Sequence, residues 1–291
     1  MRLPENSKCE YWDNYSKLTA KNNRKTDWIE SLNAHFSNTV KVFCQCRFEP
    51  VIHIDGAYQL SDEQQYAAER YRVQLNAAHR PNDLHAILTN TPAWQTDPVV
   101  LHARRLDFAS VCALREQGNK PAILSSSAVI VCPETSEILL NRRASNLATY
   151  PGCLHMPGGA FIPDGTTGID DTKLSNTIIR EVYEETRIRL HWDALPPMMI
   201  AQELSTGFIQ LALLGLTVSR SALDSLENNW EGVSVRIPFD HLADALNDPT
   251  WVPSGKAQML AWLAKGAPGA GLSARFGGQT AHELFATAMK A

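Results

Sequence analysis

The chain has 291 residues, of which 44% are hydrophobic and 20% are charged, an ordinary composition for a globular protein of one or two domains. Its formal net charge of −4 gives no basic bias, so a general nucleic-acid-binding protein is not expected. The first residues lack the apolar core of a signal peptide, and no apolar run approaches the length of a membrane span. We therefore expect a cytoplasmic protein that binds neither nucleic acid nor membrane.

The first 118 residues predict an N-terminal α+β region that contains no recognisable functional motif. Ser61 followed by Gln64 has the capping-box pattern that begins a helix. We expect this region to fold and to frame a substrate or a partner surface. The expected elements are a loose or weakly helical arm at 1–37, one or two strands within 39–54, a helix at 62–78, a strand at 99–103 and a helix at 108–117.

The Gly-Asn-Lys-Pro run at 118–121 marks a boundary with a second domain over 119–291. Strand-like and helix-like segments alternate in this domain and predict an α/β fold. Ser254 is expected to cap its last helix, and Gly266 lies beyond that helix's end. The expected strands are 122–132, 137–143, 198–202, 210–218 and 233–237, and the expected helices are 174–187, 221–227, 239–246 and 254–264. The segment 154–161 is expected to lead through the Gly-Gly turn.

The cysteines are scattered and form no C-x-x-C pair. Cys44 and Cys46 alternate in a strand-like run, which would place both thiols on one face of a strand. A zinc site needs further ligands at suitable spacing, and the sequence offers none. Free thiols in a reducing cytoplasm are the expected state. The six cysteines are Cys9, Cys44, Cys46, Cys112, Cys132 and Cys153.

Three carboxylates share one stripe of the helix predicted at 174–187. At about 100° per residue, Glu181 and Glu185 differ by about 40°, and Glu184 lies about 60° to the other side. Like charges at this spacing repel and weaken a bare helix. A cluster of hard oxygen ligands is favourable if it holds a divalent cation, so the stripe indicates Mg²⁺ or Mn²⁺. The apolar residues of this helix fall on a separate face that can be buried, namely Ile178, Ile179 and Val182.

The run Arg-Glu-Val-Tyr-Glu-Glu-Thr-Arg-Ile at 180–188, downstream of Pro-Gly-Gly at 157–159, resembles the Nudix box. The family pattern is G-x5-E-x7-R-E-U-x-E-E-x-G-U, where U is bulky and aliphatic. The second half matches at every position except Arg187, where the family has glycine. The interval from Gly159 to Arg180 is about seven residues longer than in the pattern, and Thr172 stands where the first glutamate falls. The resemblance covers about residues 120–265.

This resemblance implies a Nudix-type α/β/α sandwich with a mixed sheet, and hydrolysis of a nucleoside diphosphate linked to another moiety, with release of a nucleoside monophosphate. It implies that Glu181 and Glu185 are the main metal ligands and that Glu184 is a third ligand or assists the water. Arg180 would orient a glutamate of the cluster. The paired glycines, Gly158 and Gly159, would let the backbone approach the metal or the phosphate closely, with Gly159 beside the metal.

Two departures from the pattern carry structural expectations. A non-glycine residue at Arg187 disfavours a left-handed helix end, so the helix is expected to run on or to end with a different bend. Asp170 and Asp171 are the carboxylates nearest to Thr172. They are interpreted as a solvated acidic turn, or as outer metal ligands if the inserted loop folds back.

Candidate residues for the proton transfer and for the substrate lie outside the box. Glu203 and Glu231 are alternatives for the general base, and each is also interpretable as an ordinary surface residue. Candidate phosphate contacts are Arg142, Arg143, Gly158 and Lys256, the last in the first turn of a predicted helix. The same residues are also interpretable as solvated surface charges or, for the glycine, as part of a turn.

A small nucleotide conjugate is the expected partner. The layout resembles that of the mammalian Nudix UDP-glucose diphosphatases, with short similarities at 69–75 and 253–256, which favours a nucleotide sugar. Coenzyme A and ADP-ribose are alternatives, although five positions of the coenzyme A pyrophosphatase signature differ here. A second hypothesis is a non-catalytic nucleotide-binding or regulatory protein on the same fold, motivated by the inserted loop, Thr172 and Arg187. The sequence is compatible with a homodimer and does not specify one.

Overall fold

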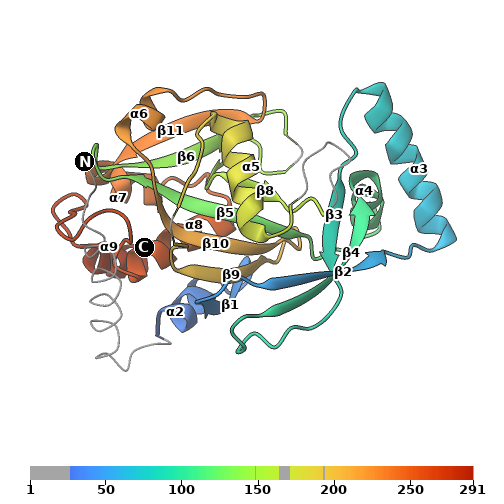
Figure 1. Ribbon diagram of the computed structural model, residues 1–291, viewed down its shortest axis with the longest axis horizontal. Helices are drawn as coiled ribbons and strands as arrows, with labels where there is room; N and C mark the ends of the chain where they lie inside the picture. The colour runs from blue at the N-terminus through green and yellow to red at the C-terminus, as the bar shows by residue number, and fades with distance from the viewer. Residues whose placement is uncertain (1–26, 148, 164–170, 193, 291) are drawn as a thin grey trace, which may run out of the picture.

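The structure is a computed structural model that describes residues 27–147, 149–163, 171–192 and 194–290. Its largest element is a mixed sheet with the strand order β1-β9-β10-β5-β6-β11, in which β7 pairs with β6 and β8 pairs with β5 (Figure 1). The β10–β5 pair is parallel and the other pairs are antiparallel. The strands are β1 (Val40–Cys46), β5 (Leu124–Cys132), β6 (Glu137–Arg143), β7 (Leu154–His155), β8 (Gly158–Ala160), β9 (Met198–Glu203), β10 (Ile209–Thr217) and β11 (Gly232–Pro238).

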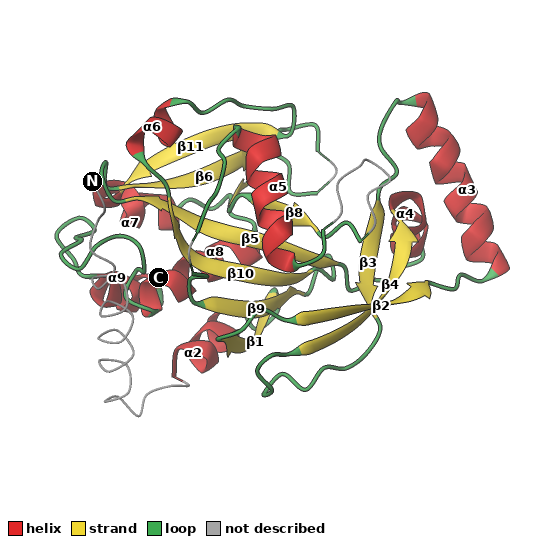
Figure 2. Ribbon diagram, in the orientation of Figure 1, coloured by secondary structure: helices red, strands yellow, loops and turns green. Residues whose placement is uncertain are grey.

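Helices cover both faces of this sheet, as Figure 2 shows, and the prediction of an α/β sandwich with a mixed sheet is confirmed. The central strand β5 is buried throughout. Val129 and Val131 face the core beneath α2, α8 and α9, whereas Ile130 and Ala128 face the core beneath α5. The second half of β5, 128–132, is a continuous apolar run, as expected of a strand that is buried on both faces. The helices are α2 (Asp27–His35), α5 (Leu174–Thr186), α6 (Arg220–Asp224), α7 (Leu242–Leu246), α8 (Pro253–Ala264) and α9 (Ala281–Ala288), with the short 3-10 helix η1 (Phe239–His241) before α7.

The first 118 residues do not form a separate unit, so the predicted boundary at 118/119 is wrong. Strand β1 is the edge strand of the main sheet, where it pairs with β9. Helix α2 buries Trp28 and Leu32 in the core beneath α8. Residues 1–26 of the predicted arm lie outside the described residues, and 27–35 are a packed helix rather than a loose segment.

A second, three-stranded sheet with the order β2-β4-β3 stands beside the main sheet (Figure 1). We call residues 51–116 the N-terminal subdomain. Helix α3 begins with the predicted capping box of Ser61 and Gln64, and Ala67 and Ala68 pack closely against Ala113 of α4. Tyr66 of this helix is 74% exposed. The elements are β2 (Val51–Ala57), α3 (Asp62–Ala77), β3 (Leu84–Leu88), β4 (Val100–Asp107) and α4 (Phe108–Glu116).

Other differences from the predicted elements follow from short or ambiguous patterns. Ser254 does not cap α8, because the N-cap is Val252 and Pro253 occupies the first turn. Strand β3 and helix α9 are not apparent in the sequence, since both are short and β3 lacks polar alternation. Cys44 and Cys46 lie on one face as predicted, with their Sγ atoms 3.6 Å apart. Among the described helices, none combines the length and apolar character needed to cross a membrane.

Candidate active site

Helix α5 presents its apolar residues to the sheet and its carboxylates towards the glycine pair. Ile178 and Val182 are fully buried, whereas Ile179, predicted to be buried with them, is 38% exposed. Glu185 is 5% exposed. The side chain of Glu181 is 13% exposed and that of Glu184 is 43% exposed. The predicted stripe therefore divides into two enclosed carboxylates and one at the surface.

The glycine pair lies directly against these two carboxylates. The backbone N–H of Gly158 donates to Oε2 of Glu185 at 3.3 Å. A Cβ atom at Gly159 would lie 2.2 Å from the carboxylate carbon of Glu181. A Cβ atom at Gly158 would lie 2.3 Å from the carbonyl oxygen of Ser126 in β5. Gly158 therefore requires glycine, because the added atom would meet the backbone of β5, whereas a side chain at Gly159 would displace the Glu181 carboxylate. The small size of the two glycines brings the backbone against the acidic helix face.

Arg180 forms ion pairs that fix the cluster. Its Nη1 atom lies 2.8 Å from Glu181 Oε1 and 3.3 Å from Glu184 Oε2, and its Nη2 atom lies 2.8 Å from Asp171 Oδ2. Asp171 is 2% exposed and also accepts hydrogen bonds from Thr177 and from the N–H of Ile162. The interpretation of Asp171 as a solvated acidic turn is therefore wrong, because this carboxylate is buried and anchors Arg180. Asp170 lies outside the described residues.

The buried carboxylates repel one another. The pKa of Glu181 is raised to about 7, chiefly by burial and also by the charges of Glu184 and Glu231, against the opposing effect of Arg180. Burial also raises the pKa of Glu185 well above its usual value, with added repulsion from Glu181 and Glu231. Crowded carboxylates of this kind are stabilised when a cation binds between them.

The donor set at α5 fits a hard divalent cation. Nowhere in the described residues are three or more His, Cys, Asp or Glu side chains grouped so that they alone could hold a metal ion. Mg²⁺, however, takes one or two protein carboxylates and completes its shell with phosphate and water oxygens. Glu181 and Glu185, pressed against a glycine backbone, supply that number of ligands.

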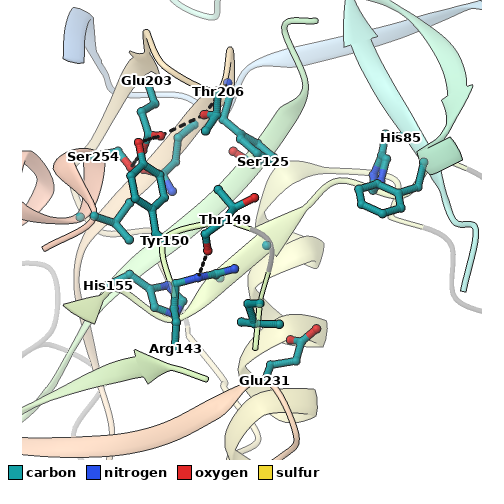
Figure 3. Close-up of a pocket in the computed structure, with 18 of the residues that line it drawn as sticks. His85, Ser125, Arg143, Thr149, Tyr150, His155, Glu203, Thr206, Glu231 and Ser254 are labelled. Atoms are coloured by element: carbon teal, nitrogen blue, oxygen red, sulfur yellow. Dashed lines mark hydrogen bonds between the residues drawn. The ribbon is translucent and has the colours of Figure 1, made fainter. Parts of the chain in front are cut away.

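A cavity of about 360 Å³ opens on the other side of the glycine pair. Gly158 and Gly159 of β8 form part of its wall, as do Ser254 and Gly255 of α8. The opposite wall comes from the N-terminal subdomain. In Figure 3, His85 of that subdomain lies apart from the group of Glu203, Tyr150 and Ser254. It also lies apart from Glu231. The subdomain residues that line the cavity are Leu75, Arg80, Pro81, Asp83, His85, Phe108 and Arg115.

Arg143 and Glu231 line the cavity next to the box. Glu231 is half-buried in the turn before β11. Burial raises the pKa of Glu231, Arg143 lowers it, and Glu184 raises it again. Arg143 Nε donates to the carbonyl oxygen of Thr149 at 2.9 Å, and Thr149 lines the cavity as well. The interpretation of Glu231 as an ordinary surface residue is therefore wrong.

Glu203 also lines the cavity but is fully engaged in hydrogen bonds. It is the last residue of β9 and is 4% exposed. Its Oε2 atom accepts from Ser254 at 2.7 Å, and its Oε1 atom accepts from hydroxyl groups on neighbouring segments. These hydroxyl donors are Tyr150 at 2.5 Å, Ser205 at 3.0 Å and Thr206 at 3.0 Å. Glu203 is thus neither a surface residue nor a carboxylate with spare acceptor capacity.

The other predicted phosphate contacts lie elsewhere. Arg142 donates to Asp248 at 3.0 Å and to the carbonyl oxygen of Gly152, away from the cavity lining. Lys256 is absent from that lining as well, although Ser254 and Gly255 of the same helical turn are part of it. Among the predicted cations, the structure therefore brings only Arg143 to the cavity.

Arg187 ends α5 in the left-handed conformation, with φ 62° and ψ 6°, so the expectation of a different helix end is wrong. Its N–H donates to the carbonyl oxygen of Tyr183 at 2.9 Å, and its guanidinium lies 5.4 Å from the Tyr183 ring centroid. The helix thus has the end that the family's glycine would give it, although a side chain in this conformation is strained.

Several cavity residues could not be found from the sequence. His155 of β7 is buried, and burial together with Arg143 lowers its pKa to about 3, so it is neutral near pH 7. Tyr150 and Ser254 enter the cavity wall through their bonds to Glu203. These residues carry no shared spacing, because the sheet assembles them from separate loops.

Among known proteins, similarity to this chain is found in solved structures. No family model matches the chain, and no curated protein matches it. Solved structures similar to the chain include a MutT protein from Methanosarcina mazei Go1, with 26% identity over 48% of this chain and 90% of that one, at a TM-score of 0.37. They also include the Nudix domain of Shewanella oneidensis NrtR, complexed with ADP ribose, with 21% identity over 47% and 83% and a TM-score of 0.33.

A bifunctional NMN adenylyltransferase/ADP ribose pyrophosphatase from Francisella tularensis is similar over 53% of this chain, with 16% identity and a TM-score of 0.41. The match spans only 45% of that protein. A further structure of the same enzyme is complexed with AMP and a manganese ion.

Proposed function

We propose that this protein is a Nudix hydrolase that cleaves the diphosphate bond of a nucleoside diphosphate linked to another moiety, with the help of a divalent cation. The observation that carries the proposal is the placement of Glu181 and Glu185 against the glycine pair that lines the cavity. Of the two crowded carboxylates, Glu181 is paired with Arg180, whereas Glu185 accepts only hydrogen bonds from the uncharged Gly158 N–H and Asn141 among the contacts of the described residues.

Glu181 and Glu185 are the residues that would hold Mg²⁺ or Mn²⁺, with Glu184 and the backbone of Gly159 beside them. When bound, the cation neutralises diphosphate oxygens and makes a water molecule more acidic. Arg180 holds Glu181 and Glu184 in position, and Asp171 in turn holds Arg180. Gly158 and Gly159 admit the substrate close to this face because neither carries a side chain.

Glu231 is the proposed general base. It faces the cavity, it is close enough to raise the pKa of both Glu181 and Glu185, and its own pKa is raised by burial. Glu203 is the weaker candidate because four hydroxyl groups already donate to it. Arg143, next to Glu231, is the proposed contact to a phosphate oxygen.

A nucleotide sugar is the proposed substrate, with ADP-ribose and coenzyme A as alternatives. The cavity of about 360 Å³ has the size of a site for a small ligand. Its walls offer Arg143 to a phosphate group on one side and a mixed polar and aromatic surface on the other. The layout similarity to UDP-glucose diphosphatases supports this choice over the alternatives.

A substrate panel tests the proposal. Purified full-length protein is incubated with nucleotide sugars, ADP-ribose, dinucleotides and coenzyme A in Mg²⁺, in Mn²⁺ and in a chelator, and released mononucleotide is measured. We expect release from at least one compound with either metal and none in the chelator. A compound that raises the melting temperature without being cleaved would instead support the non-catalytic hypothesis.

A further inference from the structure

The subdomain side of the cavity carries buried polar atoms that have no hydrogen-bond partner within the described part of the chain. They are Nδ1 of His85, Nε of Arg115 and Oε1 of Gln210. All three residues line the cavity. A buried polar atom without a partner is destabilising, so such atoms gathered at one cavity wall indicate a ligand that satisfies them.

His85 is neutral in this setting. Its pKa is lowered to about 4, chiefly by burial and also by the positive charges of Arg115 and Arg180. Its ring packs edge-on against Phe108, with the ring centroids 5.8 Å apart. A neutral imidazole nitrogen and an amide oxygen such as that of Gln210 recognise uncharged donors and acceptors rather than phosphate.

Aromatic surface accompanies these polar atoms. Phe208 and Phe108 both line the cavity, and Arg115 lies over the Phe208 ring at 5.5 Å from its centroid. Arg115 also donates through Nη2 to the carbonyl oxygen of Thr206, which fixes the guanidinium over that ring. Planar apolar faces next to neutral donors and acceptors are the features that bind a nucleobase, through its flat surface and its polar edge.

The geometry points to a nucleobase-binding subsite formed by His85, Arg115, Phe208 and Gln210 in the same cavity as the glycine pair of the box. The N-terminal subdomain would thereby set the choice of nucleotide, while α5 and β8 act on the diphosphate. This inference rests on the proposed function for the identity of its ligand as a nucleotide. It assigns the base, rather than the second moiety, to the wall that the subdomain builds.

Binding of mononucleotides tests the subsite separately from hydrolysis, because these probes contain no diphosphate bond. UMP, CMP, AMP and GMP are titrated into the full-length protein in a chelator, with glucose 1-phosphate as the probe that has a phosphate and no base. We expect at least one mononucleotide to bind more tightly than glucose 1-phosphate. Failure of the substrate panel would leave this result intact.

Two variants remove polar atoms and preserve shape. His85→Phe retains the ring against Phe108, and Gln210→Met retains the side-chain volume. Each is expected to weaken the preferred mononucleotide by at least roughly fivefold and to leave glucose 1-phosphate unchanged. His53→Phe is the matched control, since His53 is an exposed histidine of the same subdomain that lies outside the cavity lining.

For any compound that the protein hydrolyses, the two variants are expected to raise KM with little change in kcat. The inference is overturned if no mononucleotide binds more tightly than glucose 1-phosphate. It is also overturned if both variants, with unchanged melting temperatures, bind the mononucleotide as the wild type does, or if they weaken glucose 1-phosphate equally.

Discussion

The wall of the cavity formed by β8, backed by α5, gathers carboxylates, whereas the wall formed by the N-terminal subdomain offers a neutral histidine, two arginines and one carboxylate to the same space. The acidic wall comes from two short runs, 157–159 and 180–185, and its geometry follows from a helix and a glycine turn. The proposed nucleobase subsite is assembled from β3 and α4 of the subdomain and from the start of β10 in the main sheet. In the proposed function, a local sequence motif thus supplies the residues for the cation-dependent reaction. The residues that select the substrate are brought together by tertiary structure.

The ion pair between Arg180 and Asp171 is where the acidic wall is most easily broken. Asp171→Asn removes the buried negative charge that pairs with Arg180 and leaves the Arg180 guanidinium buried. Breaking a buried ion pair in this way costs on the order of 3 kcal/mol. We expect a lower free energy of unfolding in denaturant titrations and a lower rate of hydrolysis.

Asp248→Asn is the matched control for this prediction. Its partner Arg142 is 41% exposed, and such pairs contribute about 1 kcal/mol or less. Equal losses of stability in the two variants would contradict the assigned role of Asp171.

Gly159→Ala tests how closely β8 approaches the box helix. The added methyl group would lie 2.2 Å from the Glu181 carboxylate, so that side chain has to move. We expect the rate of hydrolysis at saturating Mg²⁺ to fall by at least about tenfold, because misplaced catalytic groups lose rate steeply. An unchanged rate would show that Glu181 has no fixed position in the reaction.

Asp107 is the last residue of β4 and the N-cap residue of α4, so it connects these two elements of the subdomain. Burial opposes its ionisation, but hydrogen bonds from Arg72, Ser110 and Asn82 outweigh burial and lower its pKa to about 2. Because the folded pKa lies below the unfolded value of 3.8, this stabilisation of about 2 kcal/mol is present above about pH 4 and is lost as the pH falls towards 2.

Unfolding free energies measured between pH 5 and pH 2 check this pH dependence. Asp107→Asn is expected to be less stable at pH 5 and to lose less stability on acidification than the wild type. Parallel curves for the two proteins would contradict the lowered pKa.

The strained end of α5 gives the smallest expected effect. Arg187→Gly relieves the left-handed backbone and is expected to raise the free energy of unfolding by up to about 1 kcal/mol, with hydrolysis unchanged. Arg189→Gly is the control, because Arg189 also lies over the Tyr183 ring, at 5.5 Å, without a positive φ. Stabilisation by both variants, or by neither, would contradict the explanation from backbone strain.

The two walls also differ in how far the sequence predicts them. Glu181 and Glu185 are identifiable because helical periodicity and the box fix their relation within a few residues. Glu231 is identifiable only as one of two alternatives, since its approach to the box depends on the turn before β11. The role of Glu203 as a hydrogen-bond acceptor and the placement of His85 depend on contacts between distant segments, which no local pattern records.

The boundary predicted after residue 118 fails for a related reason. The Gly-Asn-Lys-Pro run is a genuine break between α4 and β5, but β1 and α2 cross it in space to complete the main sheet and its core. Local turn signals mark where the chain changes direction, and they do not reveal which strands pair across that point.

The most direct measurement of the central claim is Mg²⁺-dependent release of nucleoside monophosphate by Glu185→Gln, compared with Glu227→Gln. Glu227 is a nearby glutamate whose side chain is 72% exposed, so its replacement controls for the loss of one carboxylate. With the fold confirmed by thermal unfolding, we predict a loss of at least about 100-fold for Glu185→Gln and wild-type release for Glu227→Gln. Full activity of Glu185→Gln would contradict the assignment of the buried box carboxylates to the reaction.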